Sequence, residues 1–161
     1  MKRKKVLFIC SGNTCRSPMA EAIFRSEIKR RKIKFVDTAS AGIFAENSRC
    51  INEKSAACLT EAGIDFSKFH PRQLKHKMLE NSFIVICMTR SQSELLNSFD
   101  NVYSMEDIAG FEIPDPYGQS LDVYRKTAEQ IKAAVDKIID RFFSQQNGSE
   151  PSDKNNQNKG E

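Results

Sequence analysis

Residues 10–17, with the sequence CSGNTCRS, constrain the fold of this chain more than any other stretch. The apolar run before them, residues 6–9 (VLFI), is too short for a helix and predicts a buried parallel strand. The residues after them, 17–24 (SPMAEAIF), are typical of a helix start, with Ser17 as the N-cap and Pro18 in the first helical position. The sequence therefore predicts a loop between a strand and the N-terminus of a helix, where an anion is favoured.

Cys10 and Arg16 bring a nucleophile and a cation to this loop. The thiolate is the nucleophilic form of cysteine, and a helix N-terminus with a nearby cation favours it, so we expect Cys10 to be ionised at neutral pH. The guanidinium of Arg16 can pair with two phosphate oxygens at once. We expect the Ser17 hydroxyl to donate to the Cys10 sulfur and stabilise it as a leaving group. These parts predict an attack on phosphorus with stabilisation of the transition state.

The main chain of the loop is expected to bind the phosphate group. Gly12 permits backbone torsions closed to other residues, and Asn13 tolerates the left-handed region better than most. The N–H groups of the loop can then turn inward as an anion-binding nest. The residues that we expect to bind substrate here are Ser11, Gly12, Asn13, Thr14, Cys15 and Ser17.

Residues 6–21 resemble the signature of the low-molecular-weight protein tyrosine phosphatases. The similarity continues in residues 40–42 (SAG), 70–74 (HPRQL), 86–89 (ICMT) and 114–118 (PDPYG), and it extends from residue 4 to about residue 143. We therefore expect a phosphatase domain over residues 1–143 and a disordered polar tail over residues 144–161.

The order of strands and helices predicts an α/β fold with a parallel sheet and right-handed crossovers. Further strands are expected at 35–40, 83–88 and 101–104, and helices or helical turns at 17–31, 48–62, 73–80, 91–98, 105–110 and 121–143. The resemblance implies a single three-layer domain with a four-stranded sheet of order 2-1-3-4, flanked by helices.

Asp115 lies between two prolines, which stiffen the chain and present the carboxyl group on a rigid turn. A leaving group needs a proton as its bond to phosphorus breaks, and a positioned carboxylic acid can supply it. The resemblance places the family's general acid and base at Asp115. Tyr117 and Phe44 are the aromatic residues that we expect to wall the cleft and bind the substrate.

Thr14 favours one substrate within this family. The tyrosine phosphatases commonly carry a bulky aliphatic residue after the loop asparagine, whereas threonine resembles the protein arginine phosphatase branch. Its smaller, polar side chain leaves room for a planar guanidinium, with which Asp115 would also pair. We predict a protein phosphatase that acts through a phosphocysteine intermediate and favours phosphoarginine; phosphotyrosine is the alternative substrate.

Other interpretations fit the sequence less well. An arsenate reductase shares this loop and fold, but its relay needs two further cysteines near the third strand, where only Cys87 lies. A non-catalytic phosphate-binding module would need neither the nucleophile nor the acid. A Walker-type nucleotide site is excluded by the absence of Gly-x4-Gly-Lys.

Composition narrows the remaining classes. The chain has five cysteines, an odd number, so we expect no disulfide framework. No two of them form a Cys-x2-Cys pair, and we expect no metal or other cofactor. The formal net charge of +4 comes from basic residues spread along the chain, which argues against nucleic acid as a partner. No apolar stretch is long enough to cross a membrane. We expect a cytoplasmic monomer or weak dimer whose partners are phosphorylated proteins.

Overall fold

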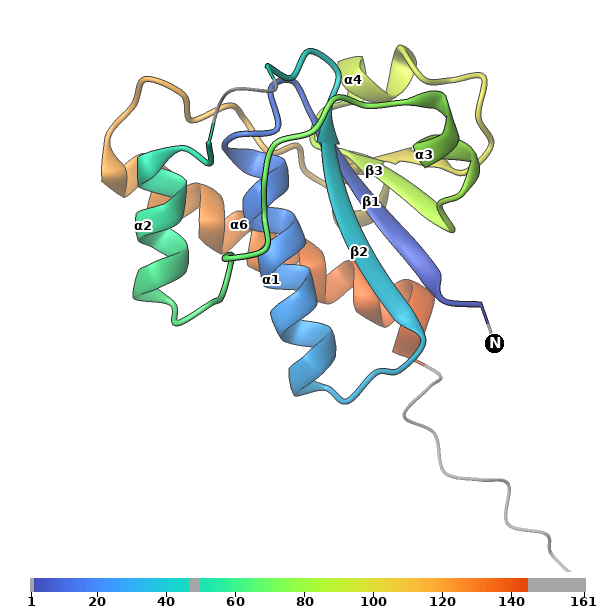
Figure 1. The fold of residues 1–161 in the computed structure, drawn as a ribbon, viewed down its shortest axis with the longest axis horizontal. Coiled ribbons are helices and arrows are strands. Elements are labelled where there is room, and N and C mark those ends of the chain that lie inside the picture. The colour runs from blue at the N-terminus through green and yellow to red at the C-terminus, as the bar shows by residue number, and fades with distance from the viewer. Residues whose placement is uncertain (1, 47–49, 145–161) are drawn as a thin grey trace, which may run out of the picture.

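The computed structural model describes residues 2–46 and 50–144. The predicted polar tail, apart from Ser144, lies outside the described residues. The described residues form four strands and six helices, with one or two helices after each strand (Figure 1). In order they are β1 (Lys4–Cys10), α1 (Arg16–Arg30), β2 (Val36–Gly42), α2 (Glu53–Glu61), α3 (His76–Glu80), β3 (Ile84–Cys87), α4 (Arg90–Glu94), β4 (Val102–Ser104), α5 (Met105–Ala109) and α6 (Leu121–Phe143).

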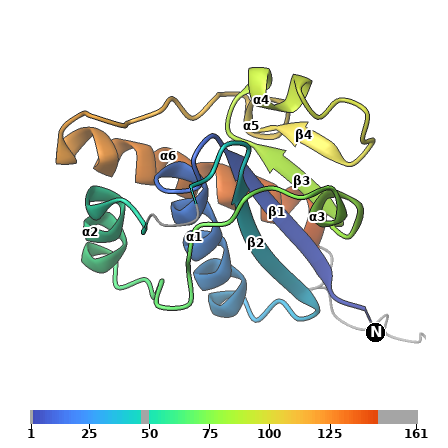
Figure 2. The same ribbon diagram turned by 45° about the horizontal axis from the view of Figure 1, so that its top comes forward.

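The sheet is parallel and has the strand order β2-β1-β3-β4, as the resemblance implies. Figure 1 looks at the sheet from the β2 edge, with α1 and α2 on one side and α3 and α4 on the other. The turned view in Figure 2 shows α5 beside β4 at the opposite edge. The α/β class, the single domain and the three layers are therefore confirmed.

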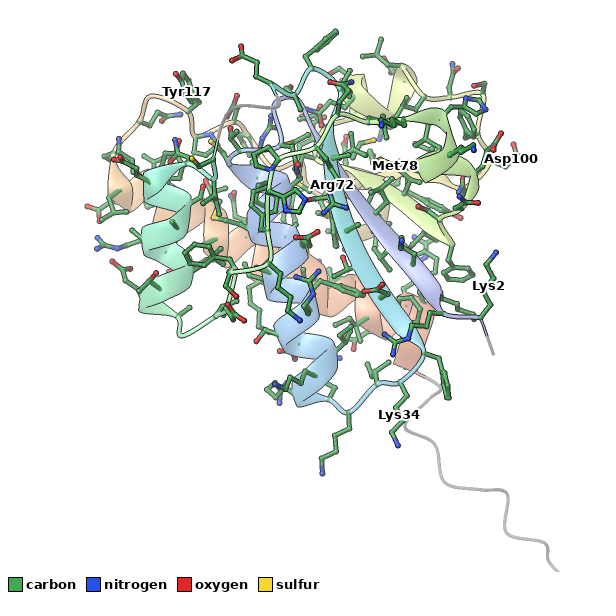
Figure 3. The ribbon with its side chains drawn as sticks, in the orientation of Figure 1. Lys2, Lys34, Arg72, Met78, Asp100 and Tyr117 are labelled. Carbon is green, nitrogen blue, oxygen red and sulfur yellow. The ribbon has the colours of Figure 1, made fainter. Side chains whose placement is uncertain are left out.

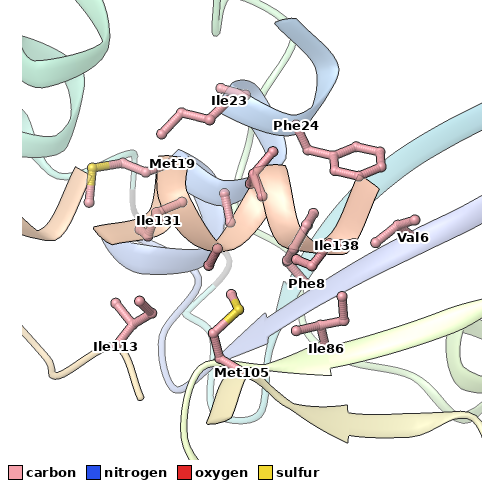
Figure 4. Packing of buried hydrophobic residues seen from close by; sticks show 14 of the residues in the cluster. Val6, Phe8, Met19, Ile23, Phe24, Ile86, Met105, Ile113, Ile131 and Ile138 are labelled. Carbon is pink, nitrogen blue, oxygen red and sulfur yellow. The ribbon is translucent and has the colours of Figure 1, made fainter. Parts of the chain in front are cut away.

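Two apolar clusters hold the three layers together. The larger one lies between the sheet and the helices α1, α5 and α6, and Figure 4 shows Phe8, Phe24 and Ile138 within it. The smaller one joins Leu7, Ile9 and their neighbours in the sheet to residues of α3 and its surroundings, such as Leu79. Successive residues of β1 thus enter opposite clusters, as expected for a central strand buried on both faces.

Several predicted boundaries differ from the structure. Helix α1 begins at Arg16 after Cys15, which offers no side-chain cap, so the prediction that Ser17 is the N-cap is wrong. The Ser17 hydroxyl contacts Cys10 instead. Helix α2 begins only at Glu53, because the Asn52 side chain caps it by accepting from two N–H groups. Residues 48 and 49 of the predicted helix lie outside the described part of the chain.

Within residues 2–46 and 50–144, no helix is both long and apolar enough to span a membrane.

Glu27 joins α1 to α6 through a cluster of ion pairs. The residue is 4% exposed, and its carboxylate accepts from Arg30 Nε at 3.1 Å and from Arg31 Nε at 2.8 Å. Lys132 Nζ of α6 lies 3.6 Å from the same carboxylate. The hydrogen bonds from Arg30 and then Arg31 lower the pKa of Glu27 to about 2, against the opposing effect of burial.

We expect this pairing to stabilise the fold at neutral pH and to be lost in acid. A carboxyl group whose pKa is lower in the folded state than in the unfolded state contributes stability above the unfolded value. That contribution disappears as the pH falls from about 5 to about 2. Glu27→Gln should therefore lower the free energy of unfolding by about 2 kcal/mol at pH 7, allowing for the exposed Arg30, and by much less at pH 2.

Urea denaturation at both pH values checks this prediction. Asp122→Asn is the matched control, because its carboxylate pairs with Arg125 but is 82% exposed, and such pairs contribute little. An equal loss for Glu27→Gln at pH 7 and pH 2 would show that the ion pairs are not the cause.

Candidate active site

The loop between β1 and α1 forms the floor of a cavity at the carboxyl edge of the sheet. The cavity has a volume of about 210 Å³ and is lined by residues 10–12 and 14–16 together with Asp115 and Tyr117. Ligands of open parallel sheets bind at this edge. The structure therefore brings Cys10, Arg16 and Asp115 together around one space.

The carbonyl groups of the loop are held from outside. Those of Cys10 and Ser11 accept from the N–H groups of Ile43 and Phe44 at 3.0 and 2.8 Å. The Thr14 carbonyl accepts from Asn52 N at 2.8 Å. Over the described residues, the backbone N–H groups of 11–15 donate to no protein acceptor. Because the carbonyls are turned outward and the N–H groups are free, the loop has the character of an anion-binding nest.

Asn13 fixes the shape of the loop from below. Its φ of 55° is left-handed, and its side chain is completely buried. The Asn13 Oδ1 accepts from Arg72 N at 2.9 Å, which fixes the orientation of the amide because a backbone N–H can only donate. The Asn13 Nδ2 then donates to Ser17 Oγ at 2.8 Å and to Ser40 Oγ at 2.9 Å.

The Ser17 hydroxyl lies 2.8 Å from Cys10 Sγ. Its oxygen already accepts from Asn13, so its hydrogen is available to the sulfur. A hydroxyl donor in this position can stabilise negative charge that develops on the sulfur during a reaction.

Arg16 and Asp115 face each other across the cavity. Arg16 is 4% exposed and donates through Nη1 to the carbonyl of Ile113 at 3.0 Å. Its Nη2 lies 3.8 Å from Asp115 Oδ2. The other carboxylate oxygen of Asp115 accepts from Tyr117 N at 3.1 Å, which orients the group on its turn. The side chain of Asp115 remains 55% exposed, so a substrate can reach it.

Cys15 and Thr14 form another part of the lining. Cys15 Sγ lies 3.8 Å from Thr14 Oγ1 and 3.5 Å from the hydroxyl of Tyr124. Burial and the neighbouring Cys15 raise the pKa of Tyr124 well above its usual range, so this phenol is neutral and can donate to the sulfur. Tyr124 comes from α6 and was not predicted as part of the site.

Three of the predicted substrate-binding residues lie away from the cavity surface. Asn13 and Ser17 lie beneath the loop and support it through their side chains. Phe44 is not part of the cavity lining; its ring is 78% exposed, and its N–H supports the loop at Ser11. Tyr117, by contrast, lines the cavity as expected for a wall.

Sequence reasoning gave no role to several residues that hold the loop, among them Gly42, Arg72, Gln92 and Tyr124. Gln92, in the capping box of α4, donates through Nε2 to Ser11 Oγ at 3.2 Å. Gly42 lies at the end of β2, opposite Cys10 of β1, and a glycine there could have indicated that the two main chains approach closely. No comparable signal marks Gln92, because only the tertiary fold brings α4 to the loop.

Gly42 is the glycine that the loop requires. A Cβ there would lie 2.8 Å from Ser11 O and 2.9 Å from Asn13 N, both main-chain atoms that cannot move without the loop. Gly12 does not have a positive φ, and a Cβ on it would meet only Thr14 Oγ1 at 3.6 Å. The expectation that Gly12 supplies unusual torsions is therefore wrong; the left-handed residue is Asn13.

Gly42→Ala should displace the loop between β1 and α1. We expect turnover to fall by about 10²-fold, since displacements near 1 Å have such effects, and stability to fall by about 1–3 kcal/mol. Activity assays and urea denaturation measure the two losses. Gly12→Ala is the steric control and should change stability far less; equal losses of stability in the two variants would contradict the argument.

Among residues 2–46 and 50–144, no three His, Cys, Asp or Glu side chains are grouped as metal ligands would be.

Comparison with known proteins gives consistent matches. The family model described as low molecular weight phosphotyrosine protein phosphatase matches residues 5–147. The low molecular weight protein-tyrosine-phosphatase PtpB of Staphylococcus epidermidis is 35% identical over 83% of this chain and 96% of its own. A protein-arginine-phosphatase of Bacillus subtilis is 30% identical over 79% of this chain and 89% of its own.

Solved structures agree with these matches. A low molecular weight protein tyrosine phosphatase from T. tengcongensis is 36% identical, with a TM-score of 0.81, over 86% of this chain and 99% of its own. The YwlE arginine phosphatase, solved as a cysteine-to-serine mutant with a phosphorylated active-site serine, is 28% identical, with a TM-score of 0.79, over 85% of this chain and 94% of its own.

Proposed function

Because the chain belongs to the low molecular weight phosphotyrosine protein phosphatase family, which includes both tyrosine and arginine phosphatases, we propose that it hydrolyses phosphoarginine in proteins through a phosphocysteine intermediate. The membership makes it a cysteine-dependent protein phosphatase. The roles of individual residues and the preferred substrate are the proposed part.

Cys10 is the proposed nucleophile. Its sulfur attacks phosphorus, and the bond from phosphorus to the leaving group breaks as Asp115 donates a proton to that group. Water then attacks the phosphocysteine, Asp115 takes a proton from the water, and the thiolate leaves with help from the Ser17 hydroxyl at 2.8 Å. Orthophosphate is released. The loop N–H groups and the buried Arg16 stabilise the negative charge on the phosphoryl oxygens in both steps.

The phosphorylated serine in the YwlE mutant supports this scheme for the present chain. In that protein a phosphoryl group is attached to the active-site residue that replaces cysteine. Cys10 lies at the end of β1 and against the N-terminus of α1, and we propose that it corresponds to that active-site residue.

The arginine proposal rests on the position of Thr14 in the cavity lining. It lines the cavity together with Asp115, so one side of the leaving group would meet a hydroxyl and another a carboxylate. A guanidinium offers N–H donors to both, whereas a phenyl ring offers none. The higher identity to PtpB, a tyrosine phosphatase, supports phosphotyrosine as the second candidate substrate.

Thr14→Ile tests the substrate assignment. An isoleucine crowds the guanidinium and removes the hydroxyl, while it offers an apolar wall to a phenyl ring. We expect turnover of phosphoarginine peptides to fall by about 10²-fold and turnover of phosphotyrosine peptides to be kept or raised. Side-by-side assays of both peptides on the parent and the variant measure this.

Thr14→Ser keeps the hydroxyl and should keep the parent's preference. If the parent already prefers phosphotyrosine, or if Thr14→Ile changes both substrates alike, the arginine assignment is wrong. The cysteine mechanism would be unaffected by that result.

The cellular partners follow from the same proposal. We propose phosphorylated proteins as substrates and a cytoplasmic location. The free thiol state of all five cysteines supports that location.

A further inference from the structure

A second cavity lies on the side of the sheet that faces α3, away from the catalytic loop. It has a volume of about 190 Å³ and shares no lining residue with the catalytic cavity. Its apolar part comes from Leu7, Ala39 and Met78. Figure 3 shows Met78 and Arg72 on this part of the molecule.

Three cationic side chains line this small space, those of Lys5, Arg72 and Lys77, and no carboxylate does. In the part of the chain that the structure describes, none of the three forms an ion pair. Like charges around one cavity repel each other, and an anion in the cavity removes that cost.

The nearby acids are engaged elsewhere. Asp37 lies opposite Lys5 in the register of β1 and β2, but its Oδ1 accepts from Thr38 N at 2.8 Å. Burial raises the pKa of Glu21, and Arg25 and then Arg72 oppose that rise; the ion pair of Glu21 is with Arg25, at 3.8 Å. Within the described residues, no acidic side chain therefore lines the cavity or forms an ion pair with its three cations.

Arg72 enters the cavity from a fixed main chain. Its N–H donates to Asn13 Oδ1 at 2.9 Å, and its carbonyl accepts from Gly42 N at 2.9 Å. Lys5 projects from the central strand β1, and it is half-buried. Cations presented from such positions lose less freedom on binding than those on mobile loops.

We propose that this cavity binds a dianionic phosphoryl group, either as free orthophosphate or attached to a small organic group. The fork of Arg72 suits two phosphoryl oxygens, and the two ammonium groups supply point charges. Asn81 and Ser82 add polar groups to the lining. A volume of about 190 Å³ is below the range of about 300–1,000 Å³ for drug-sized ligands, which favours a small anion.

Titration with inorganic phosphate, followed by amide NMR spectra at constant ionic strength, tests the proposal. The catalytic loop also binds phosphate, so the responses are read separately at Gly12 and Thr14 for that loop and at Ala39, Asn81 and Ser82 for the cavity. We expect the cavity signals to saturate, with a dissociation constant on the order of 1 mM, which a few hydrogen bonds to charged groups can supply.

The double variant Lys5→Gln/Lys77→Gln should weaken the cavity response by at least about tenfold and leave the loop response in place, which also shows that the variant is folded. Lys34→Gln/Lys75→Gln removes the same charge at exposed positions outside the cavity and should bind like the parent. Cavity signals that do not saturate, or that respond equally in the two double variants, would overturn the proposal.

Methylphosphonate, which is not hydrolysed, distinguishes the two sources of the group. Saturation by both anions means that an attached phosphoryl group is accepted, and saturation by phosphate alone identifies free orthophosphate as the ligand. Neither arm depends on turnover, so the result is independent of the proposed catalytic function.

Discussion

Cys10→Ser should lower the turnover of phosphorylated peptides by about 10⁴-fold or more. A serine hydroxyl is barely ionised at neutral pH, so the attacking group is lost even though its position is kept. The loop N–H groups and Arg16 are untouched. Arg16 donates to the Ile113 carbonyl, and the loop carbonyls accept from Ile43 and Phe44, so none of these contacts involves the sulfur. The variant should therefore still bind phosphate at the catalytic loop.

Turnover assays, phosphate binding and urea denaturation on the same sample measure this combination. Cys50→Ser is the matched control, because Cys50 is exposed and does not line the catalytic cavity. Substantial activity in Cys10→Ser would exclude the phosphocysteine mechanism at Cys10, and a comparable loss in Cys50→Ser would show that the loss is not specific to Cys10. Mass spectrometry adds a direct readout: a phosphoryl group trapped on residue 10 of the serine variant would identify this position as the one attacked.

The long final helix shows what the sequence could predict. Residues 121–143 were predicted and α6 spans Leu121–Phe143, because apolar residues recur at helical spacing and Ser120 caps the first turn. Spacing defines the buried face of α6 less well: of its last two residues, Phe143 is buried and Phe142 is half-buried. Neighbouring positions differ by about 100° around a helix, so the edge of an apolar stripe is poorly defined by spacing alone.

The sequence predicts the residues of the active-site loop but not the residues elsewhere in the chain that hold it. The strand, the loop and the helix are contiguous in sequence, and their residues define the motif directly. The contacts that hold the loop come from Arg72, Gln92 and Tyr124, which are distant in sequence and near only after folding. Local patterns also predicted Ser17 as the N-cap, because serine is generally preferred at helix starts. The contact between Ser17 and Cys10 is specific to this fold, and no general preference indicates it.

Asp115→Asn should slow substrates with poor leaving groups far more than those with good ones. Phenyl phosphate needs a proton on the departing oxygen, so we expect its turnover to fall by about 10²–10⁴-fold. Nitrophenyl phosphate leaves readily as an anion and should lose much less. The asparagine keeps an oxygen that can accept from Tyr117 N, so the turn should hold its shape.

Steady-state assays with both aryl phosphates on the parent and the variant measure the difference. Asp100→Asn removes a carboxylate at an exposed site outside the catalytic cavity, and Figure 3 shows Asp100 on the opposite side of the molecule from Tyr117; it should leave both rates unchanged. The Asp115→Asn substitution also removes the charge that faces Arg16 at 3.8 Å, an effect common to both substrates. The ratio of the two losses therefore isolates the proton transfer. Equal losses would mean that Asp115 acts on the charge of the site and that another group supplies the proton.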